Sequence, residues 1–144
     1  MKRAVVPGTF DPITKGHIDV IERAAQVFDQ ETRVRLAEEA LKEYPNVCVK
    51  GFNCLLVDFV REQKAHIVVK GLRAITDFEY EFQLTALNYE LSKDLETFFI
   101  MSPPKYMYLS SSIVREMASM GGDVKQFVPE CVERALIEYF NEAY

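Results

Sequence analysis

The apolar residues of this chain follow two spacings that alternate along its length. Short apolar and β-branched runs predict strands at residues 3–6, 46–50, 66–69 and 97–101. Apolar residues three or four positions apart predict helices at residues 32–43, 53–63 and 77–91, and also behind His17, Ser110 and Pro129. Strands that alternate with helices in this way predict an α/β fold with a doubly wound parallel sheet.

The predicted helices carry apolar stripes on one face. These stripes are Ile18, Ile21, Ala25 and Phe28, then Val34, Ala37 and Leu41, then Leu56, Phe59 and Val60, and finally Tyr80, Leu84, Leu87 and Leu91. A chain of 144 residues, 49% of them hydrophobic, is long enough for one core and too short for two ordinary domains. We therefore expect a single domain over residues 1–144.

One junction interrupts the alternation of strands and helices. Between Phe28 and Val34 one helical pattern follows another with no strand, although right-handed β-α-β winding requires a strand there. We favour a mobile segment missing between Gln30 and Glu31 over a true deletion, because loss of an inner strand would prevent folding. Gln30 and Glu31 would then not be bonded neighbours, and their Cα atoms would lie beyond the ~3.8 Å of a trans peptide.

Charge and cysteine content exclude several classes of protein. The formal net charge of −5 has the wrong sign for non-specific binding to nucleic acid. No apolar run approaches the roughly 18 residues that span a bilayer, and the first residues lack the long apolar segment of a secretory leader. Cys48, Cys54 and Cys131 form no C-x-x-C pair, which argues for packing and against disulfides or zinc. We expect a cytoplasmic protein that binds neither nucleic acid nor membranes.

The residues behind the first strand have the composition of a phosphate-binding turn. Gly8 and Gly16 let backbone N–H groups come close to a ligand oxygen. Thr14 is placed to cap the next helix, and His17 then lies in its first turn, where the helix dipole favours an anion. We expect a neutral His17 ring that donates a hydrogen bond to phosphate. Taken alone, a Gly-x-His sequence is more often an ordinary turn with a surface histidine.

Two further motifs follow predicted strands. Lys70 and Arg73 come after the strand at residues 66–69 and suit phosphate as a point charge and a planar fork. If this strand lies beside the first one, both motifs reach one crevice at the carboxyl ends of the strands. Solvated surface charges are the plain alternative. The serines at residues 110–112 open a helix, which they can cap and where an anion can bind.

Residues 8–17, GTFDPITKGH, contain the Thr-x-Gly-His sequence of the nucleotidylyltransferase superfamily, and within it they resemble the phosphopantetheine adenylyltransferase family. The resemblance recurs at residues 70–73, 77–81 and 109–115, in the family's order and near its spacing. It implies a Rossmann-like nucleotidylyltransferase fold. It also implies transfer of the adenylyl group of ATP to 4′-phosphopantetheine, which gives dephospho-coenzyme A and pyrophosphate in coenzyme A biosynthesis.

The resemblance assigns roles to individual residues. It implies catalytic roles for His17, Thr9, Lys70 and Arg73. It implies ATP contacts from Thr9, Phe10, His17, Gly71, Leu72, Arg73, Glu81, Tyr106, Met107, Tyr108, Leu109, Ser110, Ser111 and Ser112. It implies phosphopantetheine contacts from Thr9, Leu56, Lys70, Leu87 and Asn88. Without it, Glu81 and Asn88 would be solvated helix positions and Leu56 a core residue.

This chain departs from the family pattern at two places. Met107 stands where relatives often have a small polar residue. No residue matches the phosphate-contacting lysine that the family carries in a basic loop near the junction at residues 30–31.

The resemblance further implies a Mg²⁺ ion carried on the ATP phosphates, a homohexamer and feedback inhibition by coenzyme A. No carboxylate cluster suggests a metal site on the protein itself. Two alternatives stay open. A related enzyme could move a cytidylyl or adenylyl group to another small phosphate and would differ in the acceptor pocket around Leu56, Leu87 and Asn88. The second alternative is a regulatory module that binds a nucleotide without turning it over. The intact His17 argues against this alternative.

Overall fold

The computed structural model describes residues 3–8, 28–73 and 75–142, which form two compact units. Unit 1 contains residues 3–8, 52–73 and 75–108, and unit 2 contains residues 28–51 and 109–142. The single domain expected over residues 1–144 stays a prediction. No helix in the described ranges is both long enough and apolar enough to cross a membrane.

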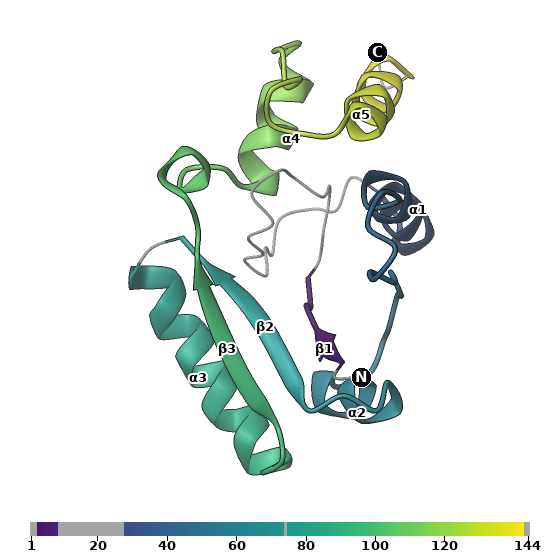
Figure 1. The fold of residues 1–144 in the computed structure, drawn as a ribbon. Helices are drawn as coiled ribbons and strands as arrows, with labels where there is room; N and C mark the ends of the chain where they lie inside the picture. Colours follow the sequence, from purple (N-terminus) through teal and green to yellow (C-terminus); the bar gives the residue numbers. More distant parts are fainter. Residues whose placement is uncertain (1–2, 9–27, 74, 143–144) are drawn as a thin grey trace. The chain divides into compact units, whose positions relative to one another are not determined.

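Unit 1 is built on a parallel sheet whose strand order is β1-β2-β3. The strands are β1 (Ala4–Val5), β2 (Ile67–Leu72) and β3 (Glu96–Met101). Ala4 pairs with Ile67, and Ile67 pairs in turn with Glu96. The expected adjacency of the first strand and the strand at residues 66–69 is confirmed, because β1 runs parallel to β2 and pairs with its first two residues (Figure 1).

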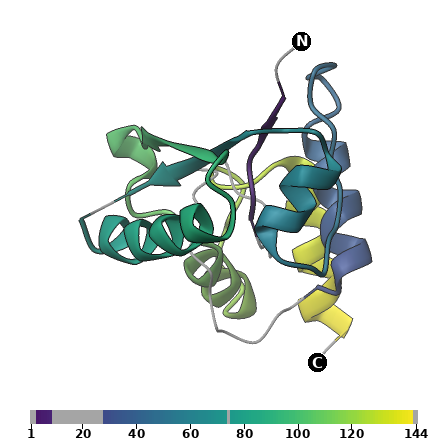
Figure 2. The same ribbon diagram turned by 90° about the horizontal axis from the view of Figure 1, so that it is seen from below.

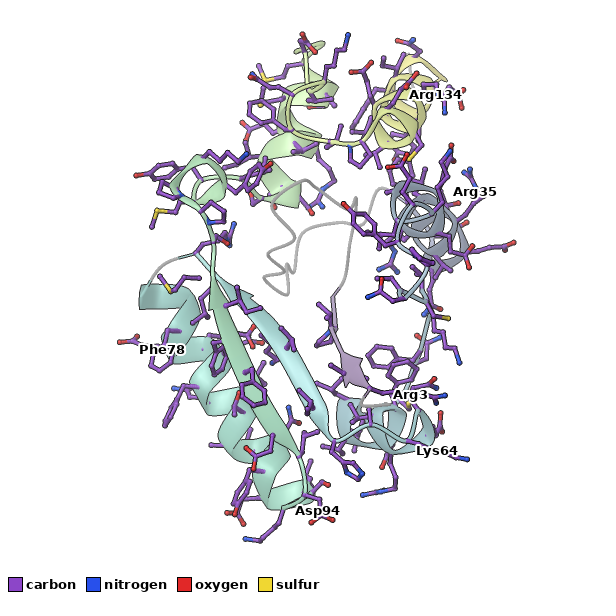
Figure 3. All side chains as sticks on the ribbon, viewed as in Figure 1. Arg3, Arg35, Lys64, Phe78, Asp94 and Arg134 are labelled. Carbon is purple, nitrogen blue, oxygen red and sulfur yellow. The ribbon has the colours of Figure 1, made fainter. Side chains whose placement is uncertain are left out.

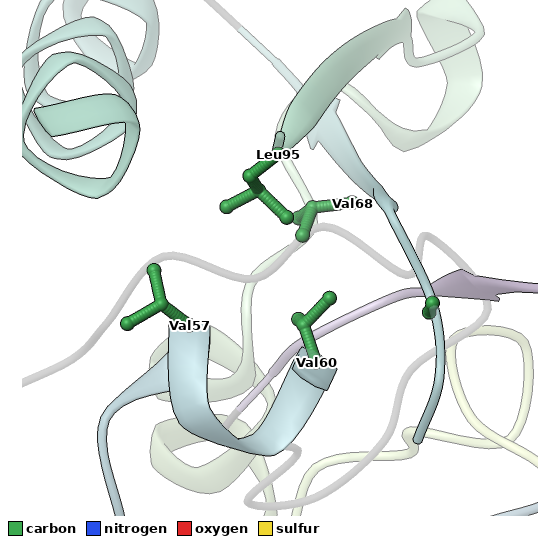
Figure 4. Packing of buried hydrophobic residues seen from close by; sticks show 5 residues of the cluster. Val57, Val60, Val68 and Leu95 are labelled. Atoms are coloured by element: carbon green, nitrogen blue, oxygen red, sulfur yellow. The ribbon is translucent and has the colours of Figure 1, made fainter. Parts of the chain in front are cut away.

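Helix α2 (Leu56–Glu62) packs its apolar face against β2. Val57 and Val60 of α2 point toward Val68 and Leu95 (Figure 4), and Ala65 completes this buried cluster. Val68 and Val60 are 0% and 2% exposed. The inward positions expected for this helix are confirmed, because Phe59 and Val60 are buried.

Helix α3 (Ile75–Leu91) covers the same face of the sheet as α2. Side chains alternate along a strand, so Val68 and Lys70 share one face of β2. Lys70 contacts α3, and the ring of Phe99 on the neighbouring strand lies 5.9 Å from the ring of Phe78 at the start of α3. The helix therefore runs alongside β2 and β3 (Figures 1 and 2).

Three of the four residues in the apolar stripe expected in α3 are exposed, and Leu84 is partly buried. Tyr80, Leu87 and Leu91 are 42%, 62% and 57% exposed, whereas Glu81 is only 6% exposed. Adjacent helical positions differ by about 100° around the axis, so Glu81 lies on a different face of α3 from its neighbour Tyr80. The polar position faces inward because Lys70 of β2 lies there to pair with Glu81.

The turn after helix α2 contains a residue in the left-handed conformation. Lys64, labelled in Figure 3, has φ of 54° and is not glycine. The N–H of Ala65 then donates to the carbonyl oxygen of Val60 at 3.1 Å. This bond closes the last turn of the helix and directs the chain into β2 with Ala65 in the core.

Unit 2 consists of helices α1 (Gln30–Ala40), α4 (Ser111–Ser119) and α5 (Glu130–Glu142). Its buried side chains include Leu36, Ala37, Val114, Val124, Val128, Val132 and Leu136. α1 and α5 lie side by side (Figures 1 and 2), and Arg134 on α5 bonds Glu39 on α1 at 3.3 Å (Figure 3). The helices expected behind Ser110 and Pro129 are confirmed.

Helix α1 begins at the junction in the sequence pattern. Asp29 is its N-cap and accepts a hydrogen bond from the N–H of Thr32 at 2.7 Å. The helix begins at Gln30 and includes Glu31. The mobile segment expected to be missing between these two residues stays a prediction. Phe28 is buried but precedes the cap and is not helical.

Residues 46–50 form no strand, contrary to expectation. Val47 is 46% exposed, and no strand among the described residues pairs with this segment. A strand requires a neighbouring backbone for its hydrogen bonds, and β-propensity alone does not supply one.

The cysteines differ in environment. Cys131 of α5 is buried, with its sulfur 3.8 Å from the carbonyl oxygen of Leu36, and burial raises the pKa of its thiol. Packing therefore accounts for Cys131. It does not account for Cys48 and Cys54, which are exposed, so the packing interpretation is wrong for these two residues.

Candidate active site

A buried ion pair lies where β2 approaches α3. The ammonium nitrogen of Lys70 is 2.5 Å from Oε2 of Glu81, and the two side chains are 10% and 8% exposed. Lys70 is the fourth residue of β2, and Glu81 lies in the first half of α3. Sequence reasoning predicted both residues as site residues and missed the contact between them. Their opposite charges were the available indication, but only the packing of the helix on the strand brings them together.

The residues after Lys70 complete the carboxyl end of β2. Gly71 pairs with Ile100, and Leu72 is buried and accepts a hydrogen bond from the N–H of Ser102 at 2.9 Å. Arg73 follows the last residue of the strand and is partly buried. The expected position of Lys70, Gly71 and Arg73 at the carboxyl end of a parallel strand is therefore confirmed.

The face of α3 that carries Glu81 continues with polar side chains. Thr85 and Asn88 lie one and two turns further along the helix, and both are partly buried. The hydroxyl oxygen of Thr85 is buried and has no hydrogen-bond partner among the described residues. Sequence reasoning missed Thr85, although its spacing from Glu81 and Asn88 placed it on their face.

The two apolar residues expected near the acceptor arm have different surroundings. Leu87 is 62% exposed. Leu56 is partly buried against the cluster of α2 and β2. Packing in the core therefore explains Leu56 without any ligand.

A short helical turn follows β3. Tyr106 ends the 3₁₀ helix η1 (Pro104–Tyr106), and the ammonium nitrogen of Lys105 lies 4.8 Å from the centre of its ring. Met107 and Tyr108 follow and are 36% and 85% exposed. Both side chains are thus accessible to a ligand, as a wall of the nucleotide site would need to be.

The serine motif opens α4 in unit 2. Ser110 is the N-cap, and its hydroxyl oxygen accepts a hydrogen bond from the N–H of Ile113 at 3.2 Å, which confirms the capping role. The guanidinium of Arg115, a buried group, bonds the hydroxyl of Ser112 at 3.3 Å. Ser111 and Ser112 begin the helix, and Leu109 before the cap is buried. The backbone N–H groups of this first turn and a buried cation make the region electropositive.

Thr9, Phe10 and His17 lie outside the described residues, so their expected roles stay predictions. Gly8 is the last described residue before them. Of the expected site residues that are described, the structure brings Lys70 and Glu81 into direct contact. No group of three or more histidine, cysteine, aspartate or glutamate side chains gathers within the described residues.

The parallel sheet and the motif positions define a class of protein. The chain matches the cytidylyltransferase-like family over residues 5–32 and 25–117, which is most of its length. It belongs to that family, and the expected Rossmann-like α/β fold of a nucleotidylyltransferase is confirmed.

The particular family follows from individual relatives. Phosphopantetheine adenylyltransferases of Clostridium perfringens strains SM101 and 13 are each 47% identical to this chain over 155 residues, which cover 96% of this chain and 94% of the relative. The chain therefore belongs to the phosphopantetheine adenylyltransferase family and is a nucleotidyltransferase.

The comparisons also locate the irregular junction. The alignment spans 155 positions and this chain has 144 residues, so at least 11 aligned positions of the relatives have no counterpart here. The two matched segments of the family pattern meet at residues 25–32, which include Gln30 and Glu31. These findings agree with the segment expected to be missing between Gln30 and Glu31, which stays a prediction.

Proposed function

We propose that this chain transfers the adenylyl group of ATP to 4′-phosphopantetheine. A phosphate oxygen of the acceptor forms a bond to the α-phosphorus of ATP, and the bond from that phosphorus to the bridging oxygen of the β-phosphate breaks. Pyrophosphate leaves with the electron pair, and dephospho-coenzyme A is the product. Besides family membership, the observation that carries this proposal is the ammonium of Lys70, held at the carboxyl end of β2 where a phosphate can bind.

The attacking phosphate is already an oxyanion, so the enzyme needs no nucleophile of its own. Catalysis then rests on holding two anions in line and stabilising the charge that develops at the α-phosphate. We assign Lys70 to the acceptor phosphate and Arg73 to the ATP tail. By family resemblance, the serines that open α4 also bind ATP, and we assign His17 and Thr9 to the binding of the α-phosphate. The cap at Ser110 and the buried Arg115 support anion binding at α4.

The acceptor arm has a matching surface on α3. Asn88 lies seven positions after Glu81, which is about 10 Å along a helix. An arm that starts at Lys70 and follows α3 therefore passes Thr85 and reaches Asn88. The unpartnered hydroxyl of Thr85 supports this path, because the arm carries amide groups that need hydrogen-bond partners. Leu87 and Leu56 would supply apolar contact.

The nucleotide wall and the metal complete the proposal. Exposed Met107 and Tyr108, with Tyr106, would contact the nucleotide base. Magnesium enters as the ATP complex, because the triphosphate oxygens are the hard ligands that this ion prefers. It would neutralise charge on the phosphates during the transfer.

We further propose a homohexamer, cytoplasmic location and inhibition by coenzyme A. Exposed apolar side chains on β3, such as Ile100 at 61%, support association with other copies. Free cysteines support a reducing compartment. Coenzyme A contains the same pantetheine arm as the product, so the arm site on α3 is a surface that it could occupy.

A pyrophosphate-release assay tests the function. Purified protein with ATP is given 4′-phosphopantetheine, nicotinamide mononucleotide or glycerol 3-phosphate, and ATP is then replaced by CTP. We expect the highest kcat/KM for ATP with 4′-phosphopantetheine, because compact polar acceptors leave the apolar contacts unfilled. Faster turnover of nicotinamide mononucleotide would move the assignment to a related transferase. Nucleotide binding without pyrophosphate release would indicate the regulatory module instead.

A further inference from the structure

Lys70 is not an isolated cation. Its ammonium group has three N–H donors, and one of them points at a carboxylate oxygen of Glu81 only 2.5 Å away. Both side chains are nine-tenths buried, so solvent screens their charges little. The Arg61–Asp58, Lys93–Glu90 and Arg134–Glu39 ion pairs are far more accessible, with side chains that are 37% to 71% exposed.

This pairing changes what Lys70 offers to a phosphate. The pair carries no net charge, so a phosphate that reaches Lys70 meets two directed N–H donors and little excess positive charge. A lone buried ammonium would bind a phosphate dianion more tightly. It would also withdraw electron density from the oxygen that must attack, because that oxygen loses negative charge as its new bond forms. Binding of this kind stabilises the bound substrate more than the transition state.

We propose that Glu81 is a positioning residue that acts through Lys70, orienting its ammonium and balancing its charge so that the acceptor phosphate is held without losing its nucleophilicity. This proposal rests on the function proposed above. It differs from the role that family resemblance implies for Glu81, which is a direct contact with ATP. Lys70 remains the group that touches the acceptor phosphate, and Glu81 remains behind it.

Glu81→Gln separates these two roles. The amide oxygen still accepts a hydrogen bond from Lys70, and only the negative charge is lost. We expect acceptor affinity measured without ATP by calorimetry to rise about 3–10-fold, and kcat to fall about 10-fold or more. The KM for ATP should stay within about twofold of wild type. Glu79→Gln, which removes an exposed carboxylate two residues earlier on α3, is the matched control and should leave every constant unchanged.

A double-mutant cycle tests whether the effect passes through Lys70. With Lys70→Met in place, adding Glu81→Gln should no longer raise acceptor affinity as it does in wild type, because the ammonium that it unmasks is absent. Equal effects of Glu81→Gln in both backgrounds would overturn the proposal. A higher KM for ATP with unchanged acceptor affinity would also overturn it and would make Glu81 an ATP ligand.

Two further readouts keep the outcome clear. If Glu81→Gln does not fold, Glu81→Asp draws the carboxylate back from Lys70 by one methylene and should change the same constants in the same direction by less. No change with Glu81→Asp in a folded protein would overturn the proposal. Wild-type protein that releases no pyrophosphate from ATP and 4′-phosphopantetheine would instead overturn the proposed function itself.

Discussion

A charged side chain such as Glu81 is rarely buried without a partner. Its carboxylate is 8% exposed and depends on the ammonium of Lys70, since both ions lose hydration in this position. Removing either partner leaves the other charge uncompensated, which typically costs about 3–5 kcal/mol of stability. Activity losses in single variants of this pair therefore need a measurement of folding beside them.

His17→Ala tests the residue that family resemblance makes the main catalytic group. A donor used mainly in the transition state contributes little to the bound substrates. We expect kcat to fall by about 10²–10³ while the affinity for ATP changes little, measured by pyrophosphate release and by ATP titration. Near-normal turnover of a folded variant would contradict this role.

Asn88→Leu tests the proposed path of the acceptor arm. Leucine has a similar volume, but it cannot bond an amide of the arm, which would then lose about 1–3 kcal/mol of binding. We expect a higher KM for 4′-phosphopantetheine and an unchanged KM for ATP, both from initial rates. Glu90→Gln, an exposed substitution on the same helix, serves as the control. A rise in the KM for ATP alone would place Asn88 in the nucleotide site.

At the scale of residues, the sequence predicted which side chains suit phosphate but not how they are paired. Lys70 and Arg73 could be found because basic residues followed a predicted strand; in the structure Lys70 lies in the second half of β2 and Arg73 directly follows it. The contact of Lys70 with Glu81 depends on the rotation of α3 about its axis, which an outward apolar stripe at Tyr80 and Leu87 concealed. Periodicity assumes that apolar faces turn inward, and this buried ion pair breaks the assumption.

At the scale of elements, prediction succeeded where the element carries its own stabilisation. Helices α2, α3, α4 and α5 have an apolar stripe, a cap or a preceding proline in their own sequence, and all of them form. The strand expected at residues 46–50 has no such local determinant, because a strand exists only beside another strand. The bounds of some elements shifted by a few residues. Asp29 caps α1, for example, so this helix begins at Gln30 and not at residue 32 as expected.

The cap of α1 has a pH dependence that can be measured. Hydrogen bonding from Thr32 lowers the pKa of Asp29 below its ordinary value of 3.8. A carboxyl group whose pKa is lower in the folded state stabilises above its unfolded pKa, and that contribution is lost as the pH falls through the lower folded value. The loss therefore lies below about pH 4.

Asp29→Asn isolates this contribution, because asparagine can cap the helix without titrating. We expect thermal melts of wild type and Asp29→Asn to differ at about pH 6 and to converge at about pH 2, where the carboxyl group is protonated. Asp94→Asn, in the turn after α3, should keep the wild-type dependence. A difference in Tm that stays constant with pH would exclude the carboxylate as its cause.

Lys64 tests the cost of the turn that ends α2. Its φ of 54° costs a residue with a Cβ about 1 kcal/mol of stability. Glycine adopts the same φ without this cost. We expect Lys64→Gly to raise Tm by about 2–4 °C. Lys64→Ala removes the same charge but keeps the penalty, so it should give no such gain. Equal melts for the two variants would show that the backbone conformation is not strained.

At the scale of the whole molecule, the class of protein could be predicted and its assembly could not. Four short motifs in the family's order indicated the fold, and the three that lie in the described ranges are at a strand end or a helix start, where parallel sheets bind ligands. The sequence also indicated a missing strand near residue 30, and the segment expected between Gln30 and Glu31 stays a prediction. Association with other copies leaves no such local pattern, since it depends on which apolar side chains the fold leaves exposed.

Strand β3 carries apolar side chains that the fold leaves exposed. It is an edge of the described sheet, and Phe98 and Ile100 are 54% and 61% exposed. Both point to the face opposite Phe99, which packs with Phe78 of α3. An edge strand with exposed apolar residues favours self-association unless something covers it.

Ile100→Glu places a charge in the middle of this exposed face and should disfavour burial against another copy. We expect the wild-type protein to be larger than a monomer by light scattering after size-exclusion chromatography, and the variant to shift to a smaller species with unchanged helix content. Glu96→Gln lies on the same face of the same strand and should leave the mass unchanged. An Ile100→Glu protein of wild-type mass would show that the copies meet elsewhere, and a monomeric wild type would end the proposal of a hexamer.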